Sequence, residues 1–259
     1  MSTSKNNNVW IIAGAVVFAG LLIAAGIIFG NGDTTSNNAS SSSDGVIAAA
    51  EAAGVDSDAF RSCIESENFR SNVEDDVNDA SQAGGGGTPF NVLVLNDPIT
   101  DTTQAEITGI VNNDDLVKIS QDGKRISVSG AMPYPVMTQF VDLILADPAS
   151  ENADAPDSDD IAITPVGQND HIRGNLDAEI IVVEFSDFLC PFCEQFHLTM
   201  KDVVKTYDDS ELAWVYRQFP IPQLNPQAPR YAQASECIAD IEGNEAFWQY
   251  ADQVFSQQE

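Results

Sequence analysis

Two cysteines separated by two residues are the part of this sequence best suited to chemistry. Cys190 and Cys193 follow a β-branched run from Ile180 to Val183, and apolar residues at helical spacing come after them. A thiol at the first turn of a helix is stabilised as a thiolate by unpaired N–H groups and the helix dipole. Pro191 suits the first helical position. The spacing therefore predicts a redox-active pair in which Cys193, one turn on, resolves a mixed disulfide.

One acidic residue, Glu184, interrupts the apolar run that leads to the cysteines. It shares a strand face with Ile180 and Val182. A buried carboxyl costs several kcal/mol unless it is protonated or paired. If the strand is buried on both faces, Glu184 lies beneath the cysteines and exchanges a proton with Cys193. The alternative interpretation is a glutamate at a strand edge, in solvent.

Other chemistry is less well supported by the residues. Half of a zinc site can have the Cys-x-x-Cys spacing, but about four ligands are needed, and His197 falls inside the predicted helix. We expect neither a metal nor a cofactor. His171 and His197 lack the partners of a hydrolase and are predicted to pack or to lie on the surface. The acidic run 151–160 lacks the glycine and terminal glutamate of a calcium loop.

Elements that would position the cysteines can be predicted on both sides of an acidic linker. Helices are expected at 46–55, 60–64 (capped by Ser57 or Asp58), 69–80, 134–146, 231–241 and 245–255. Strands are expected at 90–95, 107–111, 116–119, 125–129, 161–166, 180–183 and 212–216. Four prolines between Phe219 and Pro229 predict an irregular loop.

Charge and hydropathy limit the partners and the location. The chain has 40 acidic and 11 basic residues, a net charge of -29, so nucleic acid is excluded as a partner.

Residues 9–29 form an uncharged apolar run that is long enough to cross a bilayer. Lys5 predicts residues 1–8 in the cytoplasm and the rest of the chain outside, at the cell membrane. A cleaved signal peptide is the alternative, but its apolar region is normally only about 7–15 residues long. Residues 30–45 are predicted to be a flexible tether.

Several motifs together resemble the DsbA-like thiol–disulfide oxidoreductases. They are Asp170–Asn175, the Val-Val-Glu-Phe-Ser-Asp-Phe-Leu-Cys-Pro-Phe-Cys segment that ends at Cys193, Arg217–Pro220, Glu236-Cys237, Ala246–Trp248, Gly87–Pro89 and Ser129–Tyr134. The resemblance covers residues 46–147 and 161–257. It implies a thioredoxin-like α/β fold with an inserted helical subdomain.

The resemblance also implies a role for individual residues. Cys190 would be the nucleophile, Cys193 the resolving thiol and Glu184 the buried acid. Thr88 and Pro89, the latter a cis-proline, would face the substrate together with Pro191 and Phe192, which tune the redox potential. The sequence alone allows three pairings of its four cysteines. Some membrane-anchored relatives imply a structural disulfide between Cys63 and Cys237.

The order of the parts departs from that family. Residues 46–147 resemble the family's C-terminal half, residues 148–160 form the acidic linker, and residues 161–257 resemble its N-terminal half. We interpret this as a circular permutation. A domain-swapped dimer or a reordered sequence record would look the same. The loop 223–226 also lacks a histidine often found in relatives, and residues 96–121 look like an insertion.

The expected function is disulfide formation in reduced secreted or surface proteins by a membrane-tethered enzyme. The resemblance implies reoxidation by a quinone-linked membrane partner. Two alternatives stay open. The same chemistry can run as a reductase or isomerase, because direction depends on redox potential. The chain can also be a tethered binding module whose cysteines are only structural.

Overall fold

A single mixed sheet joins the two parts of the chain in this computed structural model, which describes residues 46–51, 54–111, 113, 115–148 and 160–257. The strands are β1 (Phe90–Leu95), β2 (Val117–Ile119), β3 (Arg125–Ser129), β4 (His171–Arg173), β5 (Ile180–Ser186) and β6 (Leu212–Gln218). Their order in space is β2-β3-β1-β5-β6-β4. Only β5 and β6 run parallel; the other neighbouring pairs are antiparallel. The sheet therefore has its centre where β1 of the first part meets β5 of the second.

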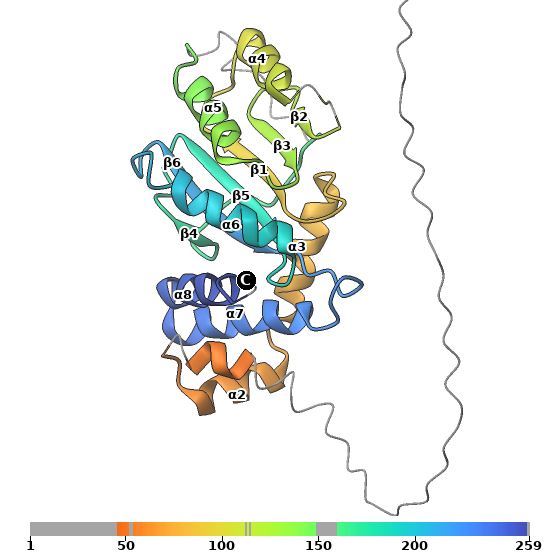
Figure 1. Cartoon of the computed structure of the whole chain (residues 1–259), viewed down its shortest axis with the longest axis vertical. Helices are drawn as coiled ribbons and strands as arrows, with labels where there is room; N and C mark the ends of the chain where they lie inside the picture. The colour runs from red at the N-terminus through yellow and green to blue at the C-terminus, as the bar shows by residue number, and fades with distance from the viewer. Residues whose placement is uncertain (1–45, 52–53, 112, 114, 149–159, 258–259) are drawn as a thin grey trace, which may run out of the picture. The chain divides into compact units, whose positions relative to one another are not determined.

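Helices cover both faces of this sheet. They are α2 (Ser57–Ser66), α3 (Arg70–Gln82), α4 (Asp101–Val111), α5 (Tyr134–Leu145), α6 (Pro191–Val203), α7 (Ala228–Glu242) and α8 (Asn244–Phe255). Figure 1 shows α5 and α6 over one face of the sheet and α2, α7 and α8 gathered at one end of it.

Side chains of the central strands point alternately to the two faces of the sheet, and each face has its own hydrophobic core. On β5, Ile180 and Val182 pack with α6 residues such as Phe196, whereas Ile181 and Val183 pack in a second core. That second core includes Ala80 of α3. Because both faces of β5 are covered, all its residues are buried, which explains its continuous apolar sequence.

The predicted strand at 107–111 is wrong, because these residues end helix α4. Threonine, isoleucine and glycine lower the helix propensity of this segment. Tertiary contacts override that propensity: the Thr100 hydroxyl accepts a hydrogen bond from the Thr103 backbone N–H, and Ile107 is fully buried in the core.

The predicted strand at 161–166 is also wrong. The segment pairs with no neighbouring strand, because side chains form hydrogen bonds with its backbone N–H and C=O groups. The Thr164 N–H donates to Asp79 Oδ1 at 2.7 Å, and the Thr164 carbonyl accepts from Arg217 Nη1 at 2.9 Å. A smaller correction concerns α2, which is capped by Asp56 rather than by Ser57 or Asp58.

Three of the predicted segments lie wholly or mostly outside the described residues. No helix among the described residues is long and apolar enough to cross a membrane, and the predicted span at 9–29 lies outside them. The tether at 30–45 and most of the acidic linker, 149–159, also lie outside them.

Candidate active site

Strand β5 delivers the cysteine pair onto the first turn of α6. Cys190 is the N-cap residue and has extended backbone angles, and Pro191 occupies the first helical turn, as predicted. Both thiols are free, and Cys190 and Cys193 are 3% and 0% exposed. Phe192, between them, is 61% exposed. Both thiols are thus buried, whereas the ring of the residue between them is exposed.

The loop before β1 lies beside the Cys190 thiol. The Thr88–Pro89 peptide bond is cis, and the Cys190 thiol lies 3.7 Å from the Thr88 carbonyl oxygen. Pro89 is buried, and its carbonyl accepts a hydrogen bond from Gly130 N–H at 2.9 Å. The pairing of Phe90 with Phe185 brings this loop to β5. Residues about a hundred positions apart therefore meet at Cys190.

Glu184 lies in the core rather than at a solvent-exposed strand edge. Its side chain is 0% exposed, and its Oε2 accepts a hydrogen bond from Trp214 Nε1 at 2.9 Å. Burial raises the pKa of Glu184 to about 7, although the Ser186 hydroxyl and the Trp214 indole act in the opposite direction. A carboxyl with that pKa can take up or release a proton at neutral pH.

The two thiols have opposite electrostatic environments. The Cys193 thiol, the Thr88 hydroxyl and the backbone N–H groups of Phe192 and Cys193 lower the pKa of Cys190 to about 5, against the effect of burial. Burial and the neighbouring Cys190 raise the pKa of Cys193 well above its usual value. Cys190 is therefore the thiolate at neutral pH, and Cys193 holds its proton.

Two further residues of the site were missed by the sequence analysis. Asp187 holds the turn before α6, because its carboxylate accepts hydrogen bonds from the backbone N–H groups of Leu189 and Ile221 at 2.8 and 2.7 Å. Its own N–H donates to Cys193 Sγ at 3.4 Å. Asn91, fully buried, is in register with Glu184 on the adjacent strand β1. A polar residue in an apolar strand was the available signal for Asn91.

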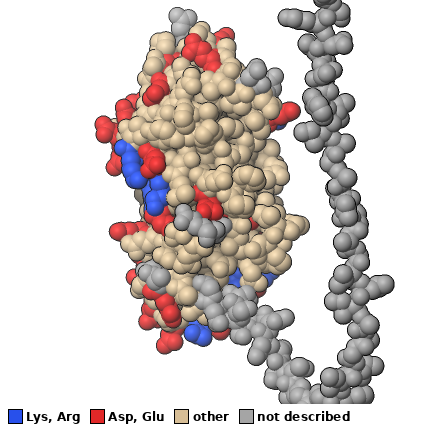
Figure 2. Space-filling model, in the orientation of Figure 1, with Lys and Arg blue, Asp and Glu red and all other residues tan. Residues whose placement is uncertain are grey.

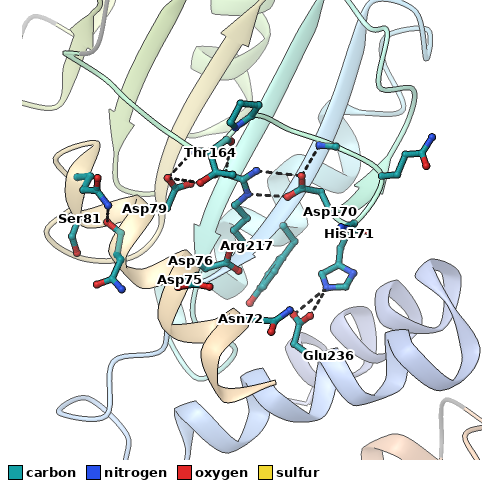
Figure 3. A pocket seen from close by; sticks show the side chains of 17 residues that line it. Asn72, Asp75, Asp76, Asp79, Ser81, Thr164, Asp170, His171, Arg217 and Glu236 are labelled. Atoms are coloured by element: carbon teal, nitrogen blue, oxygen red, sulfur yellow. Dashed lines mark hydrogen bonds and ion pairs between the residues drawn. The ribbon is translucent and has the colours of Figure 1, made fainter. Parts of the chain in front are cut away.

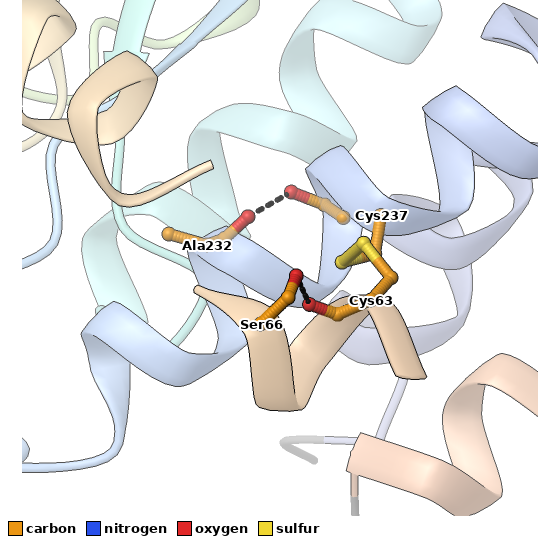
Figure 4. Close-up of a disulfide and its surroundings, with 5 residues drawn as sticks. Cys63, Ser66, Ala232 and Cys237 are labelled. Carbon is orange, nitrogen blue, oxygen red and sulfur yellow. Dashed lines mark hydrogen bonds between the residues drawn. A yellow bond between two sulfur atoms is a disulfide. The ribbon is translucent and has the colours of Figure 1, made fainter. Parts of the chain in front are cut away.

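The other two cysteines form a disulfide remote from this pair. It joins Cys63 of α2 to Cys237 of α7, with 5.8 Å between the Cα atoms (Figure 4). This is the pairing that the family resemblance implied. The bridge ties together residues 174 positions apart, one from each part of the chain.

The two histidines pack against aromatic rings in the described structure. His171 stacks on Phe247 with 3.7 Å between ring centroids, and its Nε2 lies 3.0 Å from Glu236 Oε1. His197 is 1% exposed, and its Nε2 lies 2.7 Å from Asp252 Oδ1. Burial lowers the pKa of His197 despite that carboxylate.

A large acidic pocket, of about 930 Å³, lies away from the cysteines (Figure 3). Arg217 lines this pocket and forms ion pairs with Asp79 at 2.7 Å and with Asp170 at 2.8 Å. Asp76 accepts a hydrogen bond from the Gln218 N–H, and burial raises its pKa to about 7. This pocket could not be predicted from the sequence, because the residues that line it come from α3, the segment 164–171, β6 and α7.

Comparison with known proteins agrees with the position of the cysteine pair. Residues 167–259, which include β4, β5, α6 and both free cysteines, match the family model described as thioredoxin. The C-terminal part of this chain is thioredoxin-like. The thioredoxin-like segment supplies Cys190, Cys193 and Glu184, whereas Thr88 and Pro89 lie outside the matched residues.

Curated relatives of this chain are much longer proteins. The Na(+)/H(+) antiporter NhaA 1 of Mycolicibacterium vanbaalenii is 38% identical over 90 residues, which are 35% of this chain and 14% of the antiporter. NhaA 3 of Salinispora tropica is 30% identical over 100 residues, or 39% of this chain and 15% of that protein. The chain thus matches about a seventh of the length of these relatives. No solved structure matches the chain.

Proposed function

We propose that the chain is a membrane-tethered thiol–disulfide oxidoreductase that introduces disulfides into secreted or surface proteins. The observation that carries the proposal is that the two thiols have opposite pKa shifts. The pKa of Cys190 is lowered to about 5, and the pKa of Cys193 is raised well above its usual value. A low pKa for the nucleophilic cysteine favours its reduced, thiolate form, which makes the disulfide form a stronger oxidant.

The proposed reaction begins with the Cys190–Cys193 disulfide. A substrate thiolate attacks Cys190 Sγ and forms a mixed disulfide, while the electron pair of the broken S–S bond goes to Cys193. Cys193 then takes a proton, for which the proposed donor is the buried carboxyl of Glu184, whose charge raises the pKa of Cys193. A second substrate thiolate attacks the substrate sulfur of the mixed disulfide. The substrate leaves oxidised, and the enzyme retains a Cys190 thiolate and a Cys193 thiol.

Substrate is proposed to lie against Thr88, Pro89, Pro191 and Phe192. The exposed ring of Phe192 and the nearby Thr88 carbonyl support this placement. Reoxidation of the dithiol requires an electron acceptor, and we propose a quinone-linked membrane protein. The apolar run at 9–29 supports a single-pass anchor, with the site outside the cytoplasm.

We further propose that the domain is circularly permuted, with residues 46–147 and 161–257 corresponding to the exchanged halves. In its support, β1 from the first half lies between β3 and β5, and the disulfide joins α2 to α7. Neither half contains the whole sheet.

The decisive test is the pKa of Cys190 together with the redox potential of the pair. We expect the thiolate absorbance of the reduced protein to titrate at a pH of about 5, and Cys190→Ser to abolish that transition. Equilibration with glutathione should give a potential nearer the roughly −120 mV of DsbA than the roughly −270 mV of thioredoxin.

Two results would contradict the proposal in different ways. A Cys190 pKa at the ordinary value of about 8.5, with no exchange of the disulfide, would indicate a binding module with structural cysteines. A low pKa together with a potential near that of thioredoxin would indicate a reductase or isomerase.

The variant Cys193→Ser, which cannot resolve a mixed disulfide, should accumulate substrate bound to Cys190.

A further inference from the structure

A row of buried polar side chains extends from Glu184 toward the acidic pocket. Glu184 and Ser186 point to the same face of β5, because side chains alternate along a strand. Glu184 is in register with Tyr216 on β6, and Ser186 with Gln218. All four side chains are at most 1% exposed. The row thus lies side by side on two central strands, on the face that carries α6.

These side chains have polar atoms without protein partners. Glu184 Oε1, Ser186 Oγ, Tyr216 Oη and Gln218 Oε1 make no hydrogen bond to any described residue. An unsatisfied buried polar group costs about 1–3 kcal/mol. The Ser186 hydroxyl lies near enough to lower the pKa of both Glu184 and Tyr216. Four such atoms together are expected to be bridged by buried water.

The far end of the row reaches the acidic pocket. Tyr216 is one of the residues that line this pocket. Gln218 Nε2 donates to Glu236 Oε1 at 2.7 Å, and the backbone N–H of Gln218 donates to Asp76 Oδ2 at 2.8 Å. Burial raises the pKa of Asp76 to about 7, so this carboxyl exchanges protons at neutral pH. Cys190 and Cys193 do not line the pocket.

We propose that Ser186 and Tyr216 form a proton path that connects Glu184 with the acidic pocket. The proposal rests on the thiol–disulfide exchange proposed above. Both thiols are already buried, and a protein substrate joined to Cys190 covers the side from which that thiol is reached. The proton that Cys193 needs, or releases, then requires a second route to solvent.

The proton balance of the path is simple. When Cys193 leaves as a thiolate, Glu184 gives it one proton. Ser186, with bridging water, passes a proton to Glu184 and accepts one from Tyr216. Tyr216 accepts one from the pocket, so each hydroxyl ends unchanged. When Cys193 becomes a nucleophile, the same steps run in reverse. No electrons move along the path.

Other titratable groups near Glu184 are accounted for. Helix α6 contributes Cys190, Cys193 and His197, and the turn before it contributes Asp187. The ring of His197 lies 5.0 Å from that of Trp214, and its Nε2 is held by Asp252. Strand β1 contributes Asn91, which does not titrate. On β6, Tyr216 is in register with Glu184, and both Tyr216 and the adjacent Arg217 line the acidic pocket.

The test compares Tyr216→Phe with Tyr250→Phe in the full-length chain. Tyr250 is a matched control, since it is equally buried but its hydroxyl donates to the Tyr231 carbonyl at 3.3 Å, outside the row. The rate at which a thiol peptide reduces the oxidised protein is measured against pH, in H2O and in D2O. We expect Tyr216→Phe to be at least about tenfold slower with a larger solvent isotope effect; the loss is smaller than the 10²–10⁴ of direct general acid–base catalysis, because Tyr216 acts through Glu184. Tyr250→Phe should match the parent.

A second readout does not depend on catalysis. The infrared carbonyl band of protonated Glu184 shifts on exchange into D2O, and Tyr216→Phe should slow that shift about tenfold. Ser186→Ala should slow it as well, whereas Ser186→Thr, which retains the hydroxyl, should restore the parent rate. Parent-like exchange and reduction rates in a folded Tyr216→Phe variant would overturn the path. Loss of thiol exchange in the unmodified protein would instead overturn the proposed function.

Discussion

At the scale of single residues, Glu184 is an ionisable group buried in a mostly apolar strand. It occupies a strand position whose neighbours on the same face, Ile180 and Val182, are apolar and fully buried. One carboxylate oxygen is satisfied by Trp214 and the other has no partner among the described residues. Retention of an ionisable group under these conditions is typical of sites where a proton must move.

Replacement of Glu184 by glutamine is expected to stabilise the reduced protein at high pH. The folded state raises the pKa of Glu184 from 4.5 to about 7. The neutral form therefore supports folding below pH 4.5, and this contribution is lost as the pH rises through about 7. Glu184→Gln should gain about 3 kcal/mol of unfolding free energy above pH 7 and little near pH 4.5.

Urea unfolding of the reduced protein at several pH values measures this difference. Glu179→Gln, one residue before β5 and exposed, is the matched control and should change little at any pH. An unfolding free energy for Glu184→Gln that runs parallel to the parent across the whole pH range would contradict a raised pKa.

At the scale of elements, Arg217 joins three segments that are far apart in the sequence. It is 4% exposed and pairs with Asp79 of α3 and with Asp170 before β4. It also donates to the Thr164 carbonyl. This network replaces the strand ladder that the segment 161–166 does not form.

Substitution of Arg217 by methionine should destabilise the protein strongly. The change leaves two partly buried carboxylates without their cation, and breaking a buried pair in this way typically costs about 3–5 kcal/mol. Thermal and urea unfolding report the loss. Arg61→Met, on the exposed side of α2, should cost less than about 0.5 kcal/mol. Equal losses in the two variants would argue against a structural role for the pairs.

The same examples indicate which features a sequence can predict. Cys190, Pro191 and the strand before them could be predicted, because local spacing and β-branched composition are sufficient. Asn91 beside Glu184 could not, because cross-strand register is set by the whole sheet. Helix α4 was missed because burial of Ile107 outweighs the weak helix propensity of its segment.

At the scale of the whole molecule, the site is assembled from both parts of the chain. Glu184 and the cysteines come from the second part, whereas Thr88 and Pro89 come from the first. The disulfide and the Arg217 pairs also connect the two parts. Figure 2 shows a visible face made mostly of uncharged residues, with scattered acidic side chains and fewer basic ones, which is consistent with the net charge of -29.

A monomer with an internal disulfide is expected in solution. In a Cys190→Ser/Cys193→Ser variant only Cys63 and Cys237 remain, with 5.8 Å between their Cα atoms. On a non-reducing gel this variant should migrate as a monomer, faster than the reduced sample. A further Cys63→Ser change should abolish the shift. A covalent dimer would instead indicate that the halves are exchanged between two chains.

The central position of β1 has a consequence for biosynthesis. Its partner β5 begins at Ile180, 85 residues after β1 ends at Leu95. At roughly 5–20 residues per second, a ribosome takes about 4–17 s to make the intervening chain. During that interval one edge of β1 has no partner strand, and unpaired edges promote association between chains. We therefore expect cellular folding assistance, or the chain's own net negative charge, to limit association until β5 has emerged.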